Sequence, residues 1–348
     1  MRSGNYIETY SKRVALTDNP VTWGWVGVLC LGLVIFPFFV NDYILTIAIG
    51  VFIAAVGAIG LNVLTGSTGL ISLGQSGFLA VGAYACGLLI TDYGWPVELA
   101  FLGSGVITAL ISLLVGIPSL RLKGLYLAIT TLAFSFIITR FILFAEDLTH
   151  GPFGVRIEKP TFFGFDLSND AHFYYFSLAT VVLVTILVLN LLRSKIGRAW
   201  GAIRDHDIAA KSMGINLNRY KLLAFVVSSF IVGLAGAMTS LQIQFINVDV
   251  FSLLISIEAL AMIIIGGLGS VAGAILGAIF ITLLPEAVRY GIEFLDLDSS
   301  ANISSYIFEV RGLMTGLLII LMLRIEPEGL IGVWRKTKRY WSNWPFSI

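Results

Sequence analysis

Charged residues are scarce in this chain of 348 residues. Lysine, arginine, aspartate and glutamate together make up 12% of it, whereas hydrophobic residues make up 57%. Soluble domains carry about 25% charged residues, so the composition predicts an integral membrane protein. The net charge of +1 gives no reason to expect nucleic acid as a partner.

Residues that build metal sites and disulfides are also few. The two cysteines, Cys30 and Cys86, lie within apolar runs and are expected to be buried side chains rather than a disulfide. The three histidines, His150, His172 and His206, are scattered over loops and form no ligand set. We therefore expect no metal and no cofactor bound by this chain.

Motifs of nucleotide binding and catalysis are missing from the sequence. The dipeptide Gly-Lys does not occur, which excludes a P-loop. Neither a nucleophile elbow nor a paired-histidine zinc motif is present. We expect neither ATP binding nor catalysis by the chain itself.

Long apolar runs, by contrast, are abundant. A hydrocarbon core about 30 Å thick needs about 20 apolar residues of helix, and on this measure we predict an all-α membrane domain of about ten transmembrane helices over residues 21–323. The runs are 21–40, 43–64, 69–90, 96–117, 124–144, 173–192, 222–244, 252–265, 270–284 and 306–323. The short eighth and ninth runs could form two tilted helices or one re-entrant pair.

The loops between the runs differ in charge, which predicts the topology. Lysine and arginine are concentrated in the segment 193–221 and in the tail 324–348. In the stretch 145–172, by contrast, most of the charged residues are acidic. The positive-inside rule then places both termini and the basic segment in the cytoplasm. Residues 1–20 are polar and lack the apolar core of a signal peptide, so we expect them to form a cytoplasmic N-terminal segment.

The segment 193–221 is the longest polar stretch between two hydrophobic spans, and its basic residues face only Asp205 and Asp207. Either aspartate is expected to cap a short helix over Ile208–Met213, and Gly214 is expected to end that helix. A signal that only fixes topology needs a few basic residues, not a long segment with helix-capping residues.

We therefore predict that the segment 193–221 docks onto a soluble motor protein. Ala209 and Ala210 would leave the helix surface small enough for a groove of that protein to close over it. The residues expected to make this contact are Arg198, Arg204, Asp205, Asp207, Ala209, Ala210 and Gly214. The alternative is an ordinary cytoplasmic loop whose charge only sets the topology.

Two glycine-rich segments suggest an internal duplication. They are TGSTGLISLGQSGFLAVGAY in the first half and IIIGGLGSVAGAILGA in the second, with structural glycines Gly66, Gly69, Gly74, Gly266, Gly267 and Gly269. In an inverted repeat, such segments would begin corresponding parts of two oppositely oriented bundles and would point to a substrate pathway near the midplane. For Gly273 and Gly277, close helix packing is the favoured interpretation.

Polar side chains at membrane depth are the candidates for a translocation path, because they cost free energy unless they pair or line a wet cavity. The candidates are Asn62, Ser72, Gln75, Ser76 and Glu258. Glu258 could contact a substrate or tie two helices together, and Asn62 could bond the glycine-rich segment instead. Arg140 is expected to extend its stem to the outer interface.

Several of these segments together resemble one protein family. They include residues 62–84, RLKGLYLAITTLAF at 121–134, THGPFGV at 149–155, KPTFFGFDL at 159–167, residues 197–225 and 263–278, and RGLMTGLLIILML at 311–323. The chain resembles the LivM-type permeases, which are inner-membrane subunits of bacterial ABC importers for branched-chain and other hydrophobic amino acids. AAKSMG at 209–214 is similar to the Ala-Ala-x-x-x-Gly core by which importer permeases engage their ATPases.

The resemblance implies the fold of a type II importer permease in the bacterial inner membrane. It also implies a homologous second permease, a periplasmic binding protein, and two ATPase subunits that hold ATP and Mg. The sequence AFSFIITR departs from the family, since an acidic residue is expected near Phe136. Permeases for urea and short amides share this architecture and remain an alternative, as does a secondary carrier driven by an ion gradient through Glu258.

Overall fold

The computed structural model describes residues 20–119, 124–158, 160–294 and 328–343, and isolated positions between 313 and 324. These ranges are almost entirely helical, which confirms the prediction of an all-α membrane protein. The prediction for residues 306–323 falls mostly outside the described residues, so the count of about ten spans stays a prediction.

The elements of the first half follow the predicted runs. They are α2 (Pro20–Ile35), the 3-10 turn η1 (Phe36–Phe38), α3 (Asp42–Leu61), the π-helical turn η2 (Asn62–Gly66), α4 (Gln75–Thr91), α5 (Val97–Ser119), α6 (Leu125–Phe144) and α7 (Glu146–Thr149). Helix α4 starts six residues later than the predicted run, because the chain before it is irregular and not helical.

Short loops and longer helices follow. They are η3 (Gly151–Phe153), β1 (Val155–Arg156), β2 (Thr161–Phe162), β3 (Phe165–Asp166), α8 (Asp170–Arg193), α9 (Lys195–Asp205), α10 (Asp207–Ser212), α11 (Leu217–Ile243), β4 (Phe245–Ile246), η4 (Val248–Phe251), α12 (Leu253–Gly266), α13 (Val271–Phe294) and α15 (Gly329–Asn343). The two-residue strands pair antiparallel, β1 with β4 and β2 with β3. The eighth and ninth runs form the helices α12 and α13, which pack on each other; whether they cross the membrane or form a re-entrant pair stays a prediction.

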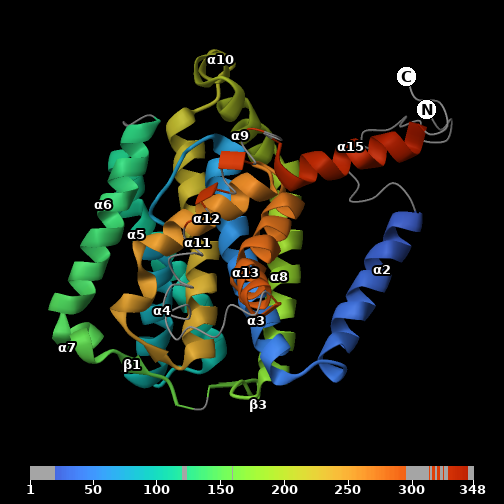
Figure 1. Ribbon diagram of the computed structural model, residues 1–348. Helices are drawn as coiled ribbons and strands as arrows, with labels where there is room; N and C mark the ends of the chain where they lie inside the picture. Colours follow the sequence, from blue (N-terminus) through green and yellow to red (C-terminus); the bar gives the residue numbers. More distant parts are fainter. Residues whose placement is uncertain are drawn as a thin grey trace.

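The bundle is centred on α11, which packs against α5, α4 and α3 (Figure 1). In the same view α6 stands at one side and α2 at the other, and both have largely exposed apolar faces. The segment α9–α10 and helix α15 lie at one end of the bundle, whereas α7 and the small strands lie at the opposite end. We call these the α10 end and the α7 end.

Hydropathy supports a multi-pass membrane protein. Five of the described helical stretches are long and apolar enough to cross a bilayer: 42–66, 97–118, 126–144, 170–193 and 217–243. Cys86 is buried in α4, as expected, but Cys30 lies on the exposed face of α2, where the sequence predicted a buried side chain. An apolar run in a membrane protein has a face toward lipid, so it does not by itself imply burial in the protein.

Glycines let the central helices touch through their backbones. A Cβ atom at Gly82 of α4 would lie 2.3 Å from the carbonyl oxygen of Gly233 in α11, and one at Gly236 would lie 2.2 Å from that of Leu79. Small residues at such crossings are typical of helix pairs in membranes. Between α12 and α13, a Cβ at Gly273 or Gly277 would likewise meet backbone atoms, so the packing interpretation is confirmed for both.

The close contact between α4 and α11 predicts that alanine destabilises the protein at Gly82 but not at Gly32. Gly82→Ala forces α4 away from α11 and is expected to reduce stability by about 1–3 kcal/mol, the usual result of overpacking. Gly32→Ala in α2 is the matched control, because no atom lies within 4 Å of a Cβ at that position. The measurement is the temperature at which detergent-purified protein loses its monodisperse gel-filtration peak. Equal temperatures for both variants would contradict the close α4–α11 contact.

Candidate functional site

The predicted docking segment is a structured part of the protein. The Trp200 side chain in α9 is fully buried, and its Nε1 donates a hydrogen bond of 2.9 Å to the carbonyl oxygen of Tyr220. Ala199 and Ile203 are buried beside it, which gives α9 an apolar face on the bundle. The side chain of Ser194 caps α9 by accepting from the Ile196 amide. Helix α9 is therefore fixed to the membrane helices.

The helix predicted over Ile208–Met213 is present as α10, but it begins one residue earlier, at Asp207. Neither Asp205 nor Asp207 caps it; the capping position is His206, whose side chain makes no such bond, so that prediction is wrong. Gly214 does end the helix, with a φ of +84° that favours glycine. Its amide and that of Ile215 donate to carbonyl oxygens of the last turn.

Asp207 does not cap α10 but pairs with a lysine of another helix. Its Oδ2 accepts a hydrogen bond of 2.7 Å from Nζ of Lys221 at the start of α11, and the lysine side chain is only 10% exposed. Two mostly buried opposite charges at this distance hold their helices in one relative position. Asp207 therefore connects α10 to α11, a role that spacing in the sequence did not reveal.

The outer surface of α10 and its C-terminal cap carries two large apolar side chains beside the exposed Lys211 and Ser212, and the described part of the chain does not cover them. Ile208 is 70% exposed and Met213 is 80% exposed. Ala209 is exposed as well, whereas Ala210 is buried against the bundle, so only one of the two alanines contributes to the surface. Exposed large apolar side chains gathered on one short helix indicate an interaction site.

Arg204, on the last turn of α9, lies against both glycine-rich breaks. A Cβ at Gly269 would lie 2.2 Å from Nη1 of Arg204, and one at Gly69 would lie 3.8 Å from its Cα and Cγ atoms. Both glycines have positive φ, at +80° and +74°. The α9–α10 segment thus contacts the two interrupted segments directly through Arg204. Arg198, by contrast, is exposed and donates to the carbonyl of Arg193.

The two breaks also bind each other. The side-chain oxygen of Asn62, which is 1% exposed, accepts a hydrogen bond of 2.9 Å from the amide of Gly269. A Cβ at Gly66 would lie 2.5 Å from that same nitrogen. Gly267 in turn packs on the backbone at Glu328 and Gly329, where α15 begins. We call this meeting of η2, the turn 266–270, α9 and α15 the glycine junction.

The placement of the glycine junction corrects the repeat interpretation. Gly66 ends a helical stretch of 25 residues that starts at Asp42, so the first break lies at the end of a span and not at its midpoint. The second break contacts the first, and both lie at the α10 end beside α9. They do not begin oppositely oriented bundles, because both face the same end.

The chain between Gly69 and Gln75 is irregular, with a φ of +74° at Gly69, and side chains of neighbouring helices accept from the amide of Leu73 and from that of Ser76 in the first turn of α4. Thr131 of α6 accepts from the Leu73 amide at 3.0 Å, and Ser256 of α12 accepts from the Ser76 amide at 2.9 Å. Irregular backbone at membrane depth is tolerated only with such partners. Sequence reasoning missed Thr131 and Ser256, which appear in the sequence as ordinary hydroxyl residues of apolar helices.

The predicted path residues divide into two groups. Ser72 is buried and accepts from the Gly74 amide, and Gln75 is buried with its Nε2 donating to the Gly57 carbonyl at 3.1 Å. Glu258 is buried in α12. These three side chains and Asn62 lie outside the lining of the main cleft, and Ser76 lies within it. A role in transport stays a prediction for all five.

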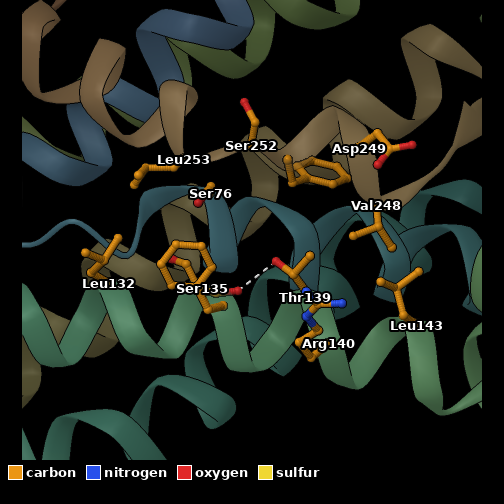
Figure 2. Close-up of a pocket in the computed structure, with 12 residues that line it drawn as sticks. Ser76, Leu132, Ser135, Thr139, Arg140, Leu143, Val248, Asp249, Ser252 and Leu253 are labelled. Atoms are coloured by element: carbon orange, nitrogen blue, oxygen red, sulfur yellow. Dashed lines mark hydrogen bonds between the residues drawn. The ribbon is translucent and has the colours of Figure 1, made fainter.

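The main cleft has a volume of about 370 Å³ and lies between α6 on one side and η4 with the start of α12 on the other (Figure 2). Its lining comprises Ser76, Leu132, Ser135, Phe136, Thr139, Arg140, Leu143, Val248, Asp249, Phe251, Ser252 and Leu253. Arg140, for which the sequence predicted only a reach to the interface, is part of this wall. Within the described ranges, no three His, Cys, Asp or Glu side chains are grouped as a metal site requires.

Comparison with known proteins decides the family. The family model described as branched-chain amino acid transport system / permease component matches residues 43–323, most of the chain. The chain belongs to this family. The matched range runs from the second residue of α3 through α13, and therefore contains both glycine-rich breaks, the α9–α10 segment and the cleft.

Individual relatives agree with this assignment. This permease is 34% identical to the high-affinity branched-chain amino acid transport system permease protein LivM of Escherichia coli, over 89% of this chain and 75% of the relative. It is 33% identical to LivM of Salmonella typhimurium, over 87% and 73%. A probable branched-chain amino acid transport permease protein LivH of Methanocaldococcus jannaschii is 26% identical over 82% and 91%. No solved structure shows a significant match to the chain.

The ion pair between Lys221 and Asp207 gives a prediction for this permease. Lys221→Met leaves the carboxylate of Asp207 without its partner and is expected to destabilise the α10–α11 contact by about 1–3 kcal/mol. The double variant with Asp207→Leu removes both charges and should recover most of that loss. The measurement is amide hydrogen exchange in α10. Equal protection in the single variant and the unaltered protein would contradict the assigned role.

Proposed function

We propose that the chain is the transmembrane permease subunit of an ATP-driven importer of branched-chain amino acids. Its family membership and the names of its relatives support the substrate class. Under this proposal it pairs with a homologous second permease, receives substrate from a periplasmic binding protein, and contacts two ATPase subunits that bind ATP and Mg. It acts as a transport subunit and not as an enzyme.

The α10 surface supports the proposed contact with the ATPases. Ile208 and Met213 are exposed and apolar, and the space above Gly214 is open, since no atom lies within 4 Å of a Cβ there. A helix this short does not hold its position by itself, but α10 is tied to α11 by the Asp207–Lys221 pair. It therefore presents a fixed apolar face to a partner.

The glycine junction supports a route for coupling. A displacement of α9 would move Arg204, which lies against Gly69 and Gly269. Those residues belong to the segments that lead into α4 and α13. ATPase subunits drive the change only if they bind the two permease conformations with different affinity, so the contact with α10 must differ between these conformations.

The same reasoning assigns an orientation. The α10 end would face the cytoplasm and the α7 end the periplasm, with the chain spanning the bacterial inner membrane. The start of α2 and helix α15 lie toward the α10 end, which supports cytoplasmic termini. Helix α15 carries Arg335, Lys336 and Lys338, as expected for a cytoplasmic segment.

Reconstitution tests the proposed function directly. Vesicles that contain this permease, the second permease and the ATPases are expected to take up leucine only when binding protein and ATP are supplied. Uptake by this chain alone, driven by a proton or sodium gradient, would contradict the proposal and would favour a secondary carrier that uses Glu258. Uptake of urea or acetamide instead of leucine would assign the chain to the related amide permeases.

The docking surface gives a second test. The double variant Ile208→Gln, Met213→Gln is expected to fold normally, because both side chains are exposed, and to lose most of its affinity for the ATPases. Uptake should fall by about tenfold or more, which corresponds to a loss of interaction of about 1.4 kcal/mol or more.

The matched control for this test is Leu148→Gln in α7, which is 53% exposed at the opposite end of the bundle. This variant should leave uptake and ATPase co-purification unchanged. If Leu148→Gln and the double variant reduced uptake equally, or if neither did, α10 would not be the docking helix.

A further inference from the structure

The cleft between α6 and the η4–α12 turn holds two opposite charges that sequence reasoning did not bring together. Arg140 projects from α6, and Asp249 projects from η4 on the opposite wall (Figure 2). Arg140 lies one turn before the end of α6 at Phe144, toward the α7 end. Under the proposed orientation the cleft lies in the outer half of the permease.

Both charges are exposed in the cleft, and neither makes a hydrogen bond or ion pair within the described residues, although Asp249 lies within electrostatic range of the Tyr84 hydroxyl. Arg140 and Asp249 are further apart than an ion pair allows, and the hydrogen bonds and ion pairs of the described ranges include neither side chain. Charges within a membrane domain are costly and usually pair or face a functional cavity. Two unpaired opposite charges across one cleft suit a ligand that carries both signs.

The hydroxyl groups of the cleft are largely engaged within the protein. Thr139 donates to the carbonyl of Ser135, and the Ser135 hydroxyl accepts from the Gly77 amide. The Ser76 hydroxyl accepts from that of Ser256. Arg140 and Asp249 are therefore the strong polar groups left for a ligand, as a donor of hydrogen bonds and an acceptor.

The remaining wall is apolar and of suitable size. Leu132, Phe136 and Leu143 of α6 face Val248, Phe251 and Leu253 across the cleft. Small-molecule sites in proteins have volumes of about 300–1,000 Å³ and combine an apolar lining with a few polar anchors. The volume of about 370 Å³ lies at the lower end of that range, as a small ligand requires.

We propose that this cleft is a transit site for a zwitterionic aliphatic amino acid, in which Arg140 binds the α-carboxylate and Asp249 binds the α-ammonium. The guanidinium offers paired donors to a carboxylate, and the Asp249 carboxylate accepts from an ammonium. The aliphatic side chain lies on Leu132, Leu143 and Leu253. The inference rests on the proposed function and adds where in the permease the substrate is recognised.

The two charges also predict what the site rejects. Urea and short amides are uncharged, so they would leave both Arg140 and Asp249 without an ionic partner. A carboxylate without an amine would satisfy only Arg140, and an amine without a carboxylate only Asp249. Both side chains are exposed on the wall of an open cleft, so the preference comes from the two charge-assisted bonds that only a ligand with both charges can make.

A cysteine reporter measures binding in the assembled complex. Thr139→Cys places a thiol on the cleft wall, and Cys30→Ser removes the exposed native thiol, while Cys86 is buried. The variant is first shown to import leucine. L-leucine is then expected to slow labelling of this thiol by a methanethiosulfonate reagent, whereas 4-methylpentanoate and isoamylamine, which each lack one charge, should not.

Variants of the two anchors sharpen the test. Arg140→Gln and Asp249→Asn are each expected to raise the leucine concentration needed for half protection by about tenfold or more, since each loses a charge-assisted bond. The matched controls are Arg156→Gln on β1 and Asp147→Asn on α7. Both are exposed charges near the same end but outside the cleft, and their removal should change nothing.

Three results would overturn the site. They are the absence of leucine protection in a complex that imports leucine, equal protection by the two single-charge analogues, and equal loss in the control variants. If the complex does not import leucine at all, the proposed function fails and not the site alone.

A zwitterionic lipid headgroup has the same pair of charges and is distinguished by vesicle composition. Protection by leucine should be the same in vesicles of phosphatidylglycerol alone and in vesicles with added phosphatidylethanolamine. If phosphatidylethanolamine alone slowed labelling as much as leucine, and leucine then added nothing, the cleft would be a lipid site and the inference would be wrong.

Discussion

The hydrogen bond between the Asn62 side chain and the Gly269 amide fixes the arrangement of the rest of this permease. It joins the end of α3 to the start of α13, two helices that are far apart in the sequence. Glycine at positions 66 and 269 is what allows the approach, because a Cβ at either would meet backbone or side-chain atoms. Arg204 lies against the same point, so α9 cannot move without disturbing both breaks.

The absence of water in a bilayer explains why hydroxyl side chains lie beside the first break. Amides at the irregular stretch before α4 and in the first turn of α4 cannot stay unpaired, and Thr131 and Ser256 accept from those of Leu73 and Ser76. The same stretch runs from Gly69, beside Arg204, to Ser76 in the main cleft. One short segment therefore contacts α9, beside the proposed docking helix, at one end and reaches the cleft at the other, which is the connection that the proposed coupling requires.

Hydropathy was sufficient to predict the long apolar helices of the described ranges, because long apolar runs have few alternatives in a membrane. The stop at Gly214 could also be predicted, since a positive φ there has a local cause. The partner of Asp207 could not, because Lys221 belongs to another helix and only the packing of α11 brings it near. Arg140 and Asp249 were missed for the same reason: they are more than a hundred positions apart, and periodicity carries no information about two helices that face each other.

A cleft that binds the α-carboxylate and the α-ammonium recognises the two groups that all amino acids share. Its aliphatic wall would favour Leu, Ile and Val over polar side chains, but a difference of one methylene changes affinity by only about 1–3 kcal/mol. Such a site distinguishes an amino acid from an amide better than it distinguishes leucine from valine. Under the proposed function, finer selection among aliphatic side chains would fall to the binding protein, and the permease would need only to hold each amino acid weakly enough to release it.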